Sequence, residues 1–271
     1  MLTAIRRAKA GHTGGSLSCT DILNVLYNDV LDVDPSNVDD PRRNRYVQSK
    51  GHSVEALYAV LADRGFFPLS DLEGLCQAGS PYVGHPTRKV RGVEFNTGAL
   101  GHGLSISAGI ALGAKKDGDP YRVYTLLGDG ELAEGSNWEA AMMAAHYGLD
   151  NLVAILDHNT LQITASNREV CSPYPIDEKF RAFGWEVREV DGNDIPALRR
   201  AFAALPAREG KPTLLMAHTV KGKGVSFMEK QLKWHHGVPD DEQYKQAMAE
   251  LNAEKERLSA GLSAEKEVGH A

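Results

Sequence analysis

The chain has 271 residues, of which 42% are apolar and 24% charged, and its net charge is −6. This composition is typical of one large or two small globular domains and excludes a low-complexity or fibrous chain. The negative charge argues against nucleic acid or an anionic membrane as a partner. No apolar stretch approaches the roughly 20 residues of a membrane span, and the start resembles no signal peptide. The three cysteines, Cys19, Cys76 and Cys171, lie far apart, which favours a reducing cytoplasmic location.

The first half of the chain predicts three helices. Residues 20–30 place apolar side chains on one face, with Thr20 as the candidate N-cap. A second amphipathic helix is expected over 54–65, where Gly65 ends it. The segment 103–118 is rich in Gly, Ala and Ser, and each Gly weakens an isolated helix by about 1 kcal/mol. We expect such a helix to pack closely against a sheet or a ligand.

From residue 121 onward, strands and helices alternate. The pattern predicts strand 121–127, helix 136–148, strand 151–157, strand 186–190, helix 195–204 and strand 213–219. The first two strands are almost continuously apolar, as expected of parallel strands buried on both faces. We therefore predict an α/β fold with a doubly wound, mainly parallel sheet and helices on both faces. Residues 1–271 are expected to form one domain, with a charged tail that is flexible from about residue 258.

Two polar side chains follow the first two of these strands. Asp129 stands between Gly128 and Gly130, and Asn159 follows the next strand. Ligands of an open parallel sheet bind outside the carboxyl ends of its strands, so neighbouring strands would bring both side chains together. Their oxygens, with a carbonyl such as that of Leu161, suit Mg²⁺, for which Ca²⁺ or Mn²⁺ is expected to substitute. The glycines and the helix start that follows favour a phosphate. Taken alone, G-D-G is equally typical of a tight turn with Asp129 as a helix cap.

The G-D-G … N pattern resembles the thiamine diphosphate motif, and the order of further motifs resembles the cofactor-binding segment of transketolase. The stretches that carry this resemblance are "AGHTGGSLSCTDIL" (10–23), "RNRYVQSKGHSVEALYAVL" (43–61), "GHPTRKVRGVEFNTGALGHGLSISAGIALG" (84–113), "VDGNDIPALRRAF" (190–202), "KPTLLMAHTVKGKGVSFME" (211–229) and "WHHGVP" (234–239). Together they cover nearly the whole chain. The sequence departs from the family at Thr13, where Pro is usual, and in the very short segment before His12.

The resemblance implies roles for four histidines that stand beside glycine in expected loops. His12 and His85 would contact hydroxyl groups of the sugar donor near the reacting carbon. His52 and His236 would lie beside the diphosphate and the thiazolium ring of the cofactor. A histidine that titrates near neutrality can accept the hydroxyl proton that carbon–carbon cleavage releases.

The resemblance also implies the rest of the cofactor site. Gly98 and Leu100 would meet the pyrimidine ring, and Asp129, Asn159 and Leu161 would bind the metal. Glu134 would link the cofactor sites across a dimer, with an exposed glutamate at a helix start as the alternative.

Other candidates have weaker support. His102 stands where the family often has Gln and is a candidate donor near the cofactor. His146 is expected to be a packing residue, whereas the roles of His158 and His218 stay open. Lys221 and Lys223 are expected to be solvated charges on a glycine-bounded turn, with a phosphate contact as the alternative.

The reaction implied is transfer of a two-carbon ketol unit from a ketose or ketose phosphate to an aldose or aldose phosphate. Full transketolases are more than twice as long and continue into a pyrimidine-binding domain, which supplies a glutamate for the aminopyrimidine ring, and a C-terminal domain. We therefore expect the N-terminal subunit of a split transketolase. It would be active only with a C-terminal subunit that carries the pyrimidine-binding domain, in an α2β2 assembly.

Alternatives remain at this point. A transketolase-like pair of specialised metabolism would use an unusual donor or acceptor. The α subunit of a 2-oxo acid dehydrogenase lacks this set of loop histidines, and deoxyxylulose phosphate synthase shares only the early G-H and G-D-G loops. A non-catalytic phosphate-binding subunit would not need the intact histidines. A nicotinamide-binding fold is disfavoured because no G-x-G-x-x-G leads from a strand into a helix.

Overall fold

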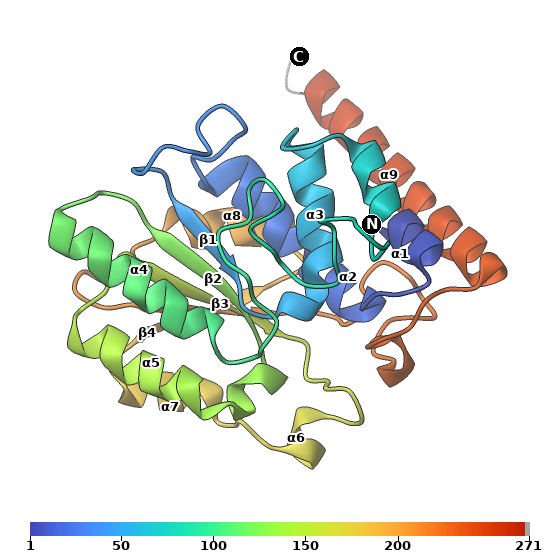
Figure 1. Ribbon diagram of the computed structural model, residues 1–271. Helices are drawn as coiled ribbons and strands as arrows, with labels where there is room; N and C mark the ends of the chain where they lie inside the picture. The colour runs from blue at the N-terminus through green and yellow to red at the C-terminus, as the bar shows by residue number, and fades with distance from the viewer. Residues whose placement is uncertain (269–271) are drawn as a thin grey trace.

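Five parallel strands form a single sheet in the order β1-β2-β3-β5-β4 (Figure 1). The structure is a computed structural model that describes residues 1–268, with side chains described to residue 261. The strands are β1 Arg45–Gln48, β2 Val123–Gly128, β3 Leu152–His158, β4 Glu186–Asp191 and β5 Thr213–His218. The predicted strands correspond to β2 to β5, and β2 and β3 are neighbours as the metal hypothesis requires.

Helices cover both faces of the sheet, which confirms the predicted doubly wound fold (Figure 1). They are α1 Leu2–Ala8, α2 Thr13–Val25, α3 Val54–Asp63, α4 Gly103–Asp117, α5 Gly135–His146, α6 Asn167–Val170, α7 Ile176–Ala182, α8 Ile195–Ala203 and α9 Asp241–Val268. Alternate side chains of β2 enter different cores: Tyr124 and Leu126 pack with α2, α3 and α8, whereas Val123 and Leu127 pack with α4, α5 and α7.

The first predicted helix begins earlier than the sequence indicated. α2 starts at Thr13 with His12 at its N-cap, and a π-helical turn follows it over 26–30. The expected cap at Thr20 is therefore wrong. A Cβ at Gly14 would lie 2.8 Å from the carbonyl oxygen of Trp234, so close tertiary packing selects glycine in a first turn that propensity alone disfavours.

The strand β1 was not predicted, because only four residues pair with β2 and no alternation marks them. The helix expected over 103–118 is confirmed as α4, whose Leu104 and Ala108 are fully buried against the sheet. This packing explains how a helix rich in small residues is stable here.

The last helix, α9, runs beside α1 at one side of the molecule (Figure 1). Thr3 Oγ1 lies 2.9 Å from the hydroxyl of Tyr244, and Arg6 forms an ion pair with Asp241. The tail expected to be flexible from about 258 falls partly on α9 and partly on residues 269–271, which lie outside the described residues. No helix within residues 1–268 is long and apolar enough to cross a membrane.

Candidate active site

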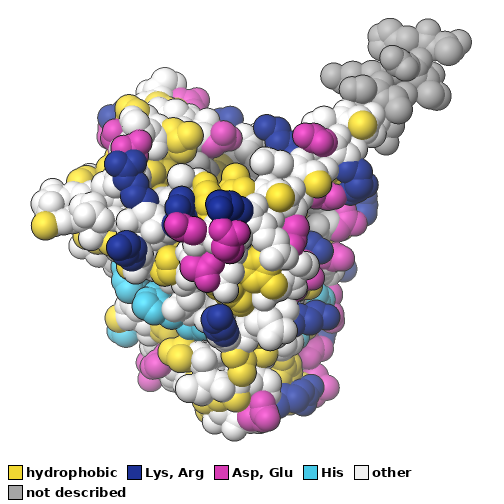
Figure 2. Space-filling model, turned by 90° about the vertical axis from the view of Figure 1, so that its right-hand side faces the viewer, with side chains coloured by type: hydrophobic (Ala, Val, Ile, Leu, Met, Phe, Trp, Pro, Cys, Tyr) yellow, Lys and Arg dark blue, Asp and Glu magenta, His cyan; other side chains and the backbone are white. Residues whose placement is uncertain are grey.

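A cavity of about 260 Å³ lies at the carboxyl edge of the sheet. It is lined by His12, Lys50, His52, His85, Gly98, Leu100, Gly128, Asp129, Gly130, Glu131, Asn159, Leu161, Gln162, Ile163, Lys221 and His235. Most residues singled out by the sequence therefore meet at one place, although six segments of the chain supply them. The exceptions are His236 and Glu134. Figure 2 shows histidine side chains gathered on one side of the viewed face, whereas acidic and basic side chains alternate over the rest.

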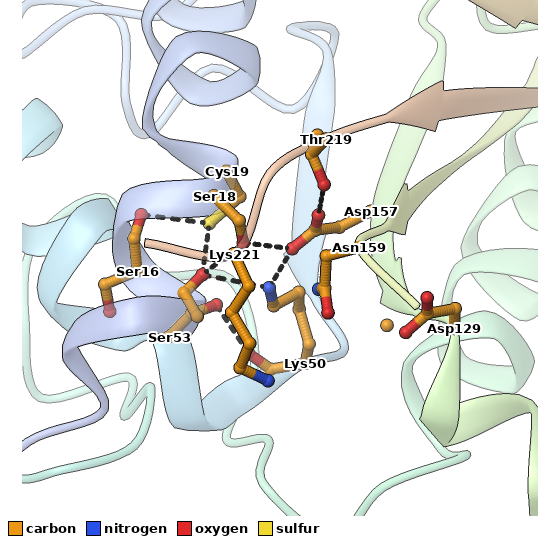
Figure 3. A network of polar contacts seen from close by, with 12 residues as sticks. Ser16, Ser18, Cys19, Lys50, Ser53, Asp129, Asp157, Asn159, Thr219 and Lys221 are labelled. Carbon is orange, nitrogen blue, oxygen red and sulfur yellow. Dashed lines mark hydrogen bonds and ion pairs between the residues drawn. The ribbon is translucent and has the colours of Figure 1, made fainter. Parts of the chain in front are cut away.

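Oxygen atoms from the tips of β2 and β3 form one end of this cavity. The carboxylate of Asp129 accepts hydrogen bonds from the backbone N–H of Gly130, at 2.8 Å, and of Thr160. Asn159 Oδ1 accepts a hydrogen bond from Leu161 N at 3.2 Å. Figure 3 shows the side chains of Asp129 and Asn159 facing each other, so the expected convergence of the two strand tips is present.

The charge at this end lacks compensation. Asp129 is only 2% exposed, and burial together with the charge of Asp157 raises the pKa of its carboxyl group to about 6. No cluster of three or more His, Cys, Asp or Glu side chains able to hold a metal occurs within the described residues. The expected donor set is instead one carboxylate, one amide and one carbonyl oxygen. Its hard oxygens and buried negative charge fit a divalent cation whose remaining positions water and phosphate fill.

Five histidine rings cluster at the other end of the cavity. The His12 ring centroid lies 5.2 Å from that of His52, 6.4 Å from His85, 5.7 Å from His235 and 4.5 Å from His236. Burial and the neighbouring charges lower the pKa of His12 to about 4 and that of His235 to about 3. These two imidazoles are therefore neutral at pH 7, and each ring offers one donor and one acceptor.

Of the two adjacent histidines in "WHHGVP", His235 lines the cavity and His236 does not. The His235 ring stacks on His52 with centroids 5.4 Å apart, and its Nδ1 lies 2.8 Å from Nζ of Lys221. His236 is exposed and contacts only the His12 side of the cluster. Sequence reasoning missed His235 because both residues stand in the same short loop and spacing does not separate them.

Lys221 is buried, which corrects the expectation of a solvated charge. It is 2% exposed, and its Nζ donates to the carbonyl oxygen of Leu161 at 3.2 Å. Burial and the nearby charge of Lys50 lower its pKa to about 8. Lys223, two residues on, is exposed as expected. The direction of a lysine side chain in a glycine-bounded turn depends on tertiary packing, so the sequence alone could not distinguish the two.

The loop that carries His85 packs against the segment of Gly98 and Leu100. Gly98 has φ 135°, and a Cβ there would overlap the His85 ring, so this position requires glycine. The two segments therefore reach the cavity wall together, although neither belongs to a helix or strand.

Two glutamates follow the G-D-G turn, and they differ in environment. Glu131 is 3% exposed and accepts hydrogen bonds from Gly101 N at 2.8 Å and Gly128 N at 3.0 Å, which ties the turn to the neighbouring loop. Glu134 is exposed outside the cavity. Sequence reasoning missed Glu131 because its role is to accept backbone hydrogen bonds.

The remaining histidines lie outside the cavity. His102 is exposed at the start of α4, and His146 is exposed at the end of α5, where it contacts Tyr147 rather than the core. The expected packing role of His146 is therefore wrong. His158 and His218 pair through their Nδ1 atoms at 3.0 Å, and His218 Nε2 lies 2.8 Å from Glu189.

Comparison with known proteins places this cavity in a family. Residues 1–259 match the family described as transketolase, thiamine diphosphate binding domain. The chain belongs to the transketolase family. Its fold and its cavity thus belong to a thiamine diphosphate-binding domain, and the family match decides against the α subunit of a 2-oxo acid dehydrogenase.

Several relatives of the same length are themselves named as subunits. A subunit of the apulose-4-phosphate transketolase of Phocaeicola vulgatus is 48% identical over 258 residues, which cover 95% of this chain and 92% of the relative. The 6-deoxy-6-sulfo-D-fructose transketolase subunit SqwG of Clostridium sp. is 41% identical over 93% of this chain and 92% of its own length. The word "subunit" in these names implies a second polypeptide in those enzymes.

Solved transketolases share the fold over a minor part of their length. The transketolase of Campylobacter jejuni superposes with a TM-score of 0.86 at 32% identity, over 92% of this chain but 40% of the solved chain. The human transketolase is 38% identical over 86% of this chain but 37% of its own length. The chain thus corresponds to well under half of these long transketolases.

Proposed function

We propose that the chain is the cofactor-binding subunit of a two-chain transketolase. In this proposal it transfers a two-carbon ketol unit from a ketose or ketose phosphate to an aldose or aldose phosphate. The observation that carries the proposal is the convergence of an oxygen-rich end and a histidine-rich end in one cavity of a thiamine diphosphate-binding domain. The cytoplasmic location remains a prediction.

The oxygen-rich end is proposed to hold Mg²⁺ and the diphosphate. Asp129, Asn159 and the carbonyl of Leu161 would bind the metal, and Gly128 and Gly130 would let the phosphates approach the backbone. Lys221 adds a buried cation at the same wall, where a phosphate would compensate its charge. When bound, thiamine diphosphate supplies the nucleophilic carbon on which carbon–carbon bonds break and form.

The histidine-rich end is proposed to bind the sugar. Neutral His12 and His85 would donate to and accept from hydroxyl groups of the donor, and a neutral imidazole can take up a hydroxyl proton as general base. His52 and His235 would lie beside the thiazolium ring and the diphosphate, with His236 behind His12. Gly98 and Leu100 would meet the pyrimidine ring.

A second polypeptide is proposed to close the site. Ile163 lines the cavity and yet is 70% exposed, as expected of an apolar side chain that a partner covers. The partner would carry the pyrimidine-binding domain in an α2β2 assembly. Glu134, exposed at the start of α5, would reach a second copy of this chain across that assembly.

The function is tested by mixing. The purified chain is expected to show no ketol transfer on its own, because the glutamate for the aminopyrimidine is supplied by the partner in this proposal. Adding the partner subunit should restore turnover by at least about 1,000-fold, the scale of losing essential acid–base help and the second wall of the site. The measurement is a coupled assay with a panel of ketose and aldose substrates, and full turnover by the chain alone would contradict the two-chain assignment.

Exchange of the two adjacent histidines tests which of them acts. His235→Ala is expected to lower kcat/KM about 100-fold or more, the usual contribution of one proton-transfer group. His236→Ala should lower it less than about tenfold, since that side chain lies outside the cavity. Equal losses in the reconstituted enzyme would contradict the assignment of His235.

The donor is proposed to be one of an unusual kind. Two relatives at 48% and 41% identity are named for apulose-4-phosphate and for 6-deoxy-6-sulfo-D-fructose, and neither name is that of a common sugar phosphate. These names favour a specialised transketolase pair, and the substrate panel should therefore include branched and sulfonated ketoses.

A further inference from the structure

A buried ion pair lies in the floor of the cavity. Nζ of Lys50, just after β1, contacts Oδ2 of Asp157, near the end of β3. Lys50 is 1% exposed and Asp157 is 0% exposed. Removing two charges from water costs more than burying an apolar pair of similar shape, so stability alone does not account for this arrangement. Lys50 also lines the cavity, which gives the pair access to a ligand.

Asp157 joins several segments that build the site. Its carboxylate accepts hydrogen bonds from Ser18 Oγ of α2, at 2.6 Å, and from Thr219 Oγ1 after β5 (Figure 3). Lys50 Nζ donates to the carbonyl oxygen of Gly15 at 3.0 Å. The segments held in this way carry His12, His52, Asn159 and Lys221 to the cavity.

The ammonium group of Lys50 retains one free donor. It has three N–H bonds, and the described residues use two of them, one for Asp157 and one for Gly15. Burial lowers the pKa of Lys50 and the charge of Asp157 raises it, with a net upward shift. Burial raises the pKa of Asp157 and Lys50 lowers it, with a net downward shift. Both side chains are therefore charged at neutral pH, in contrast to Lys221, which has no carboxylate partner among the described residues.

We propose that Lys50 is a further contact for the phosphate groups of the cofactor and that Asp157 is the positioning residue that holds its ammonium group at the cavity wall. This inference rests on the proposed placement of the diphosphate. A charged group held by a buried partner needs no ordering when the anion arrives, which favours affinity. Lys50 and Lys221 would then face the diphosphate from β1 and from the segment after β5, opposite the metal ligands.

The test uses a pair of substitutions that removes both charges. Lys50→Met/Asp157→Asn leaves no unpaired buried charge, so the free chain should melt within a few degrees of wild type. Its affinity for magnesium pyrophosphate, measured by calorimetry on the full chain, should fall about 10- to 100-fold, the usual range for lost hydrogen bonds to a charged group. Unchanged affinity at an unchanged melting temperature would overturn the proposal, because the pair would then be structural only.

Two further measurements cover the other outcomes. If the double variant does not fold, the lysine Nζ resonances of the wild-type chain decide. The resonance that Lys50→Arg removes should shift on titration with magnesium pyrophosphate, and a resonance that does not shift would overturn the proposal. Lys221→Met serves as the reference: if it weakens binding and the double variant does not, only this inference fails. If neither change weakens binding, the placement of the diphosphate fails as well.

Discussion

Asp129→Ala is expected to abolish Mg²⁺-dependent binding of thiamine diphosphate. The carboxylate is the only charged oxygen among the three proposed ligands, so its loss should lower affinity by well over 100-fold, beyond the roughly 10- to 100-fold typical of a group that only supports a ligand. Calorimetry with the cofactor at saturating Mg²⁺ measures the change. Retention of full affinity would contradict the metal site.

The pH dependence of the wild-type chain gives a second view of the same carboxylate. Its pKa of about 6 in the free chain means that the proton and the metal compete below that pH. Affinity for Mg²⁺ and the cofactor should be level above about pH 7 and fall by about tenfold per pH unit well below pH 6. The variant lacking Asp129 should not follow this curve.

A matched control is available at another strand tip. Asp191 ends β4 and binds the N–H of Asn193 at 2.9 Å, but it is exposed and lies outside the cavity. Asp191→Ala should leave the affinity for cofactor and Mg²⁺ within about twofold of wild type. An equal loss in both variants would mean that general disturbance of the strand tips, rather than metal coordination, is being measured.

Lys221→Met is expected to weaken cofactor binding while stabilising the free chain. The lost contact to a phosphate is worth about 1.5–3 kcal/mol, or roughly 10- to 150-fold in affinity. Without ligand, the ammonium group is buried with no carboxylate partner among the described residues, and its pKa of about 8 shows that the fold disfavours the charged form. Replacing it by methionine removes that unfavourable charge, so the melting temperature of the free chain should rise.

Lys223→Met is the natural comparison because Lys223 belongs to the same turn but is exposed. It should leave both the affinity and the melting temperature unchanged within error. The two variants together distinguish a buried phosphate contact from the net charge of the turn. If Lys221→Met lowered the melting temperature and left affinity intact, Lys221 would be a structural residue and not a cofactor contact.

Glycine-bounded polar residues after apolar strands were enough to predict the oxygen-rich end of the site. Asp129 and Asn159 stand at the tips of β2 and β3, and the chemistry of parallel sheets requires such tips to meet. His12, His52 and His85 were found for a similar reason, since each stands beside a glycine in a motif that spacing identifies. The contributions of Lys50, Lys221 and His235 were not found.

The fold follows the same division. Long apolar runs predicted β2 and β3 and the helices α3 and α4, because burial on a sheet requires periodic or continuous apolar residues. The strand β1 and the true start of α2 were not predicted. A four-residue strand is stable only through its neighbour, and the first turn of α2 is stable only through its contact with the segment of Trp234.

By itself, the sequence determined the doubly wound sheet, the position of the metal ligands and the membership in a thiamine diphosphate-binding family. These features depend on local patterns: apolar periodicity, glycine at turns and polar residues at strand ends. Only the tertiary structure decided which lysines are buried, which of two adjacent histidines reaches the cavity, and how Lys50 and Asp157 pair across more than a hundred positions of the chain. Burial and pairing of charges depend on segments distant in sequence, and no local pattern records which of them will meet.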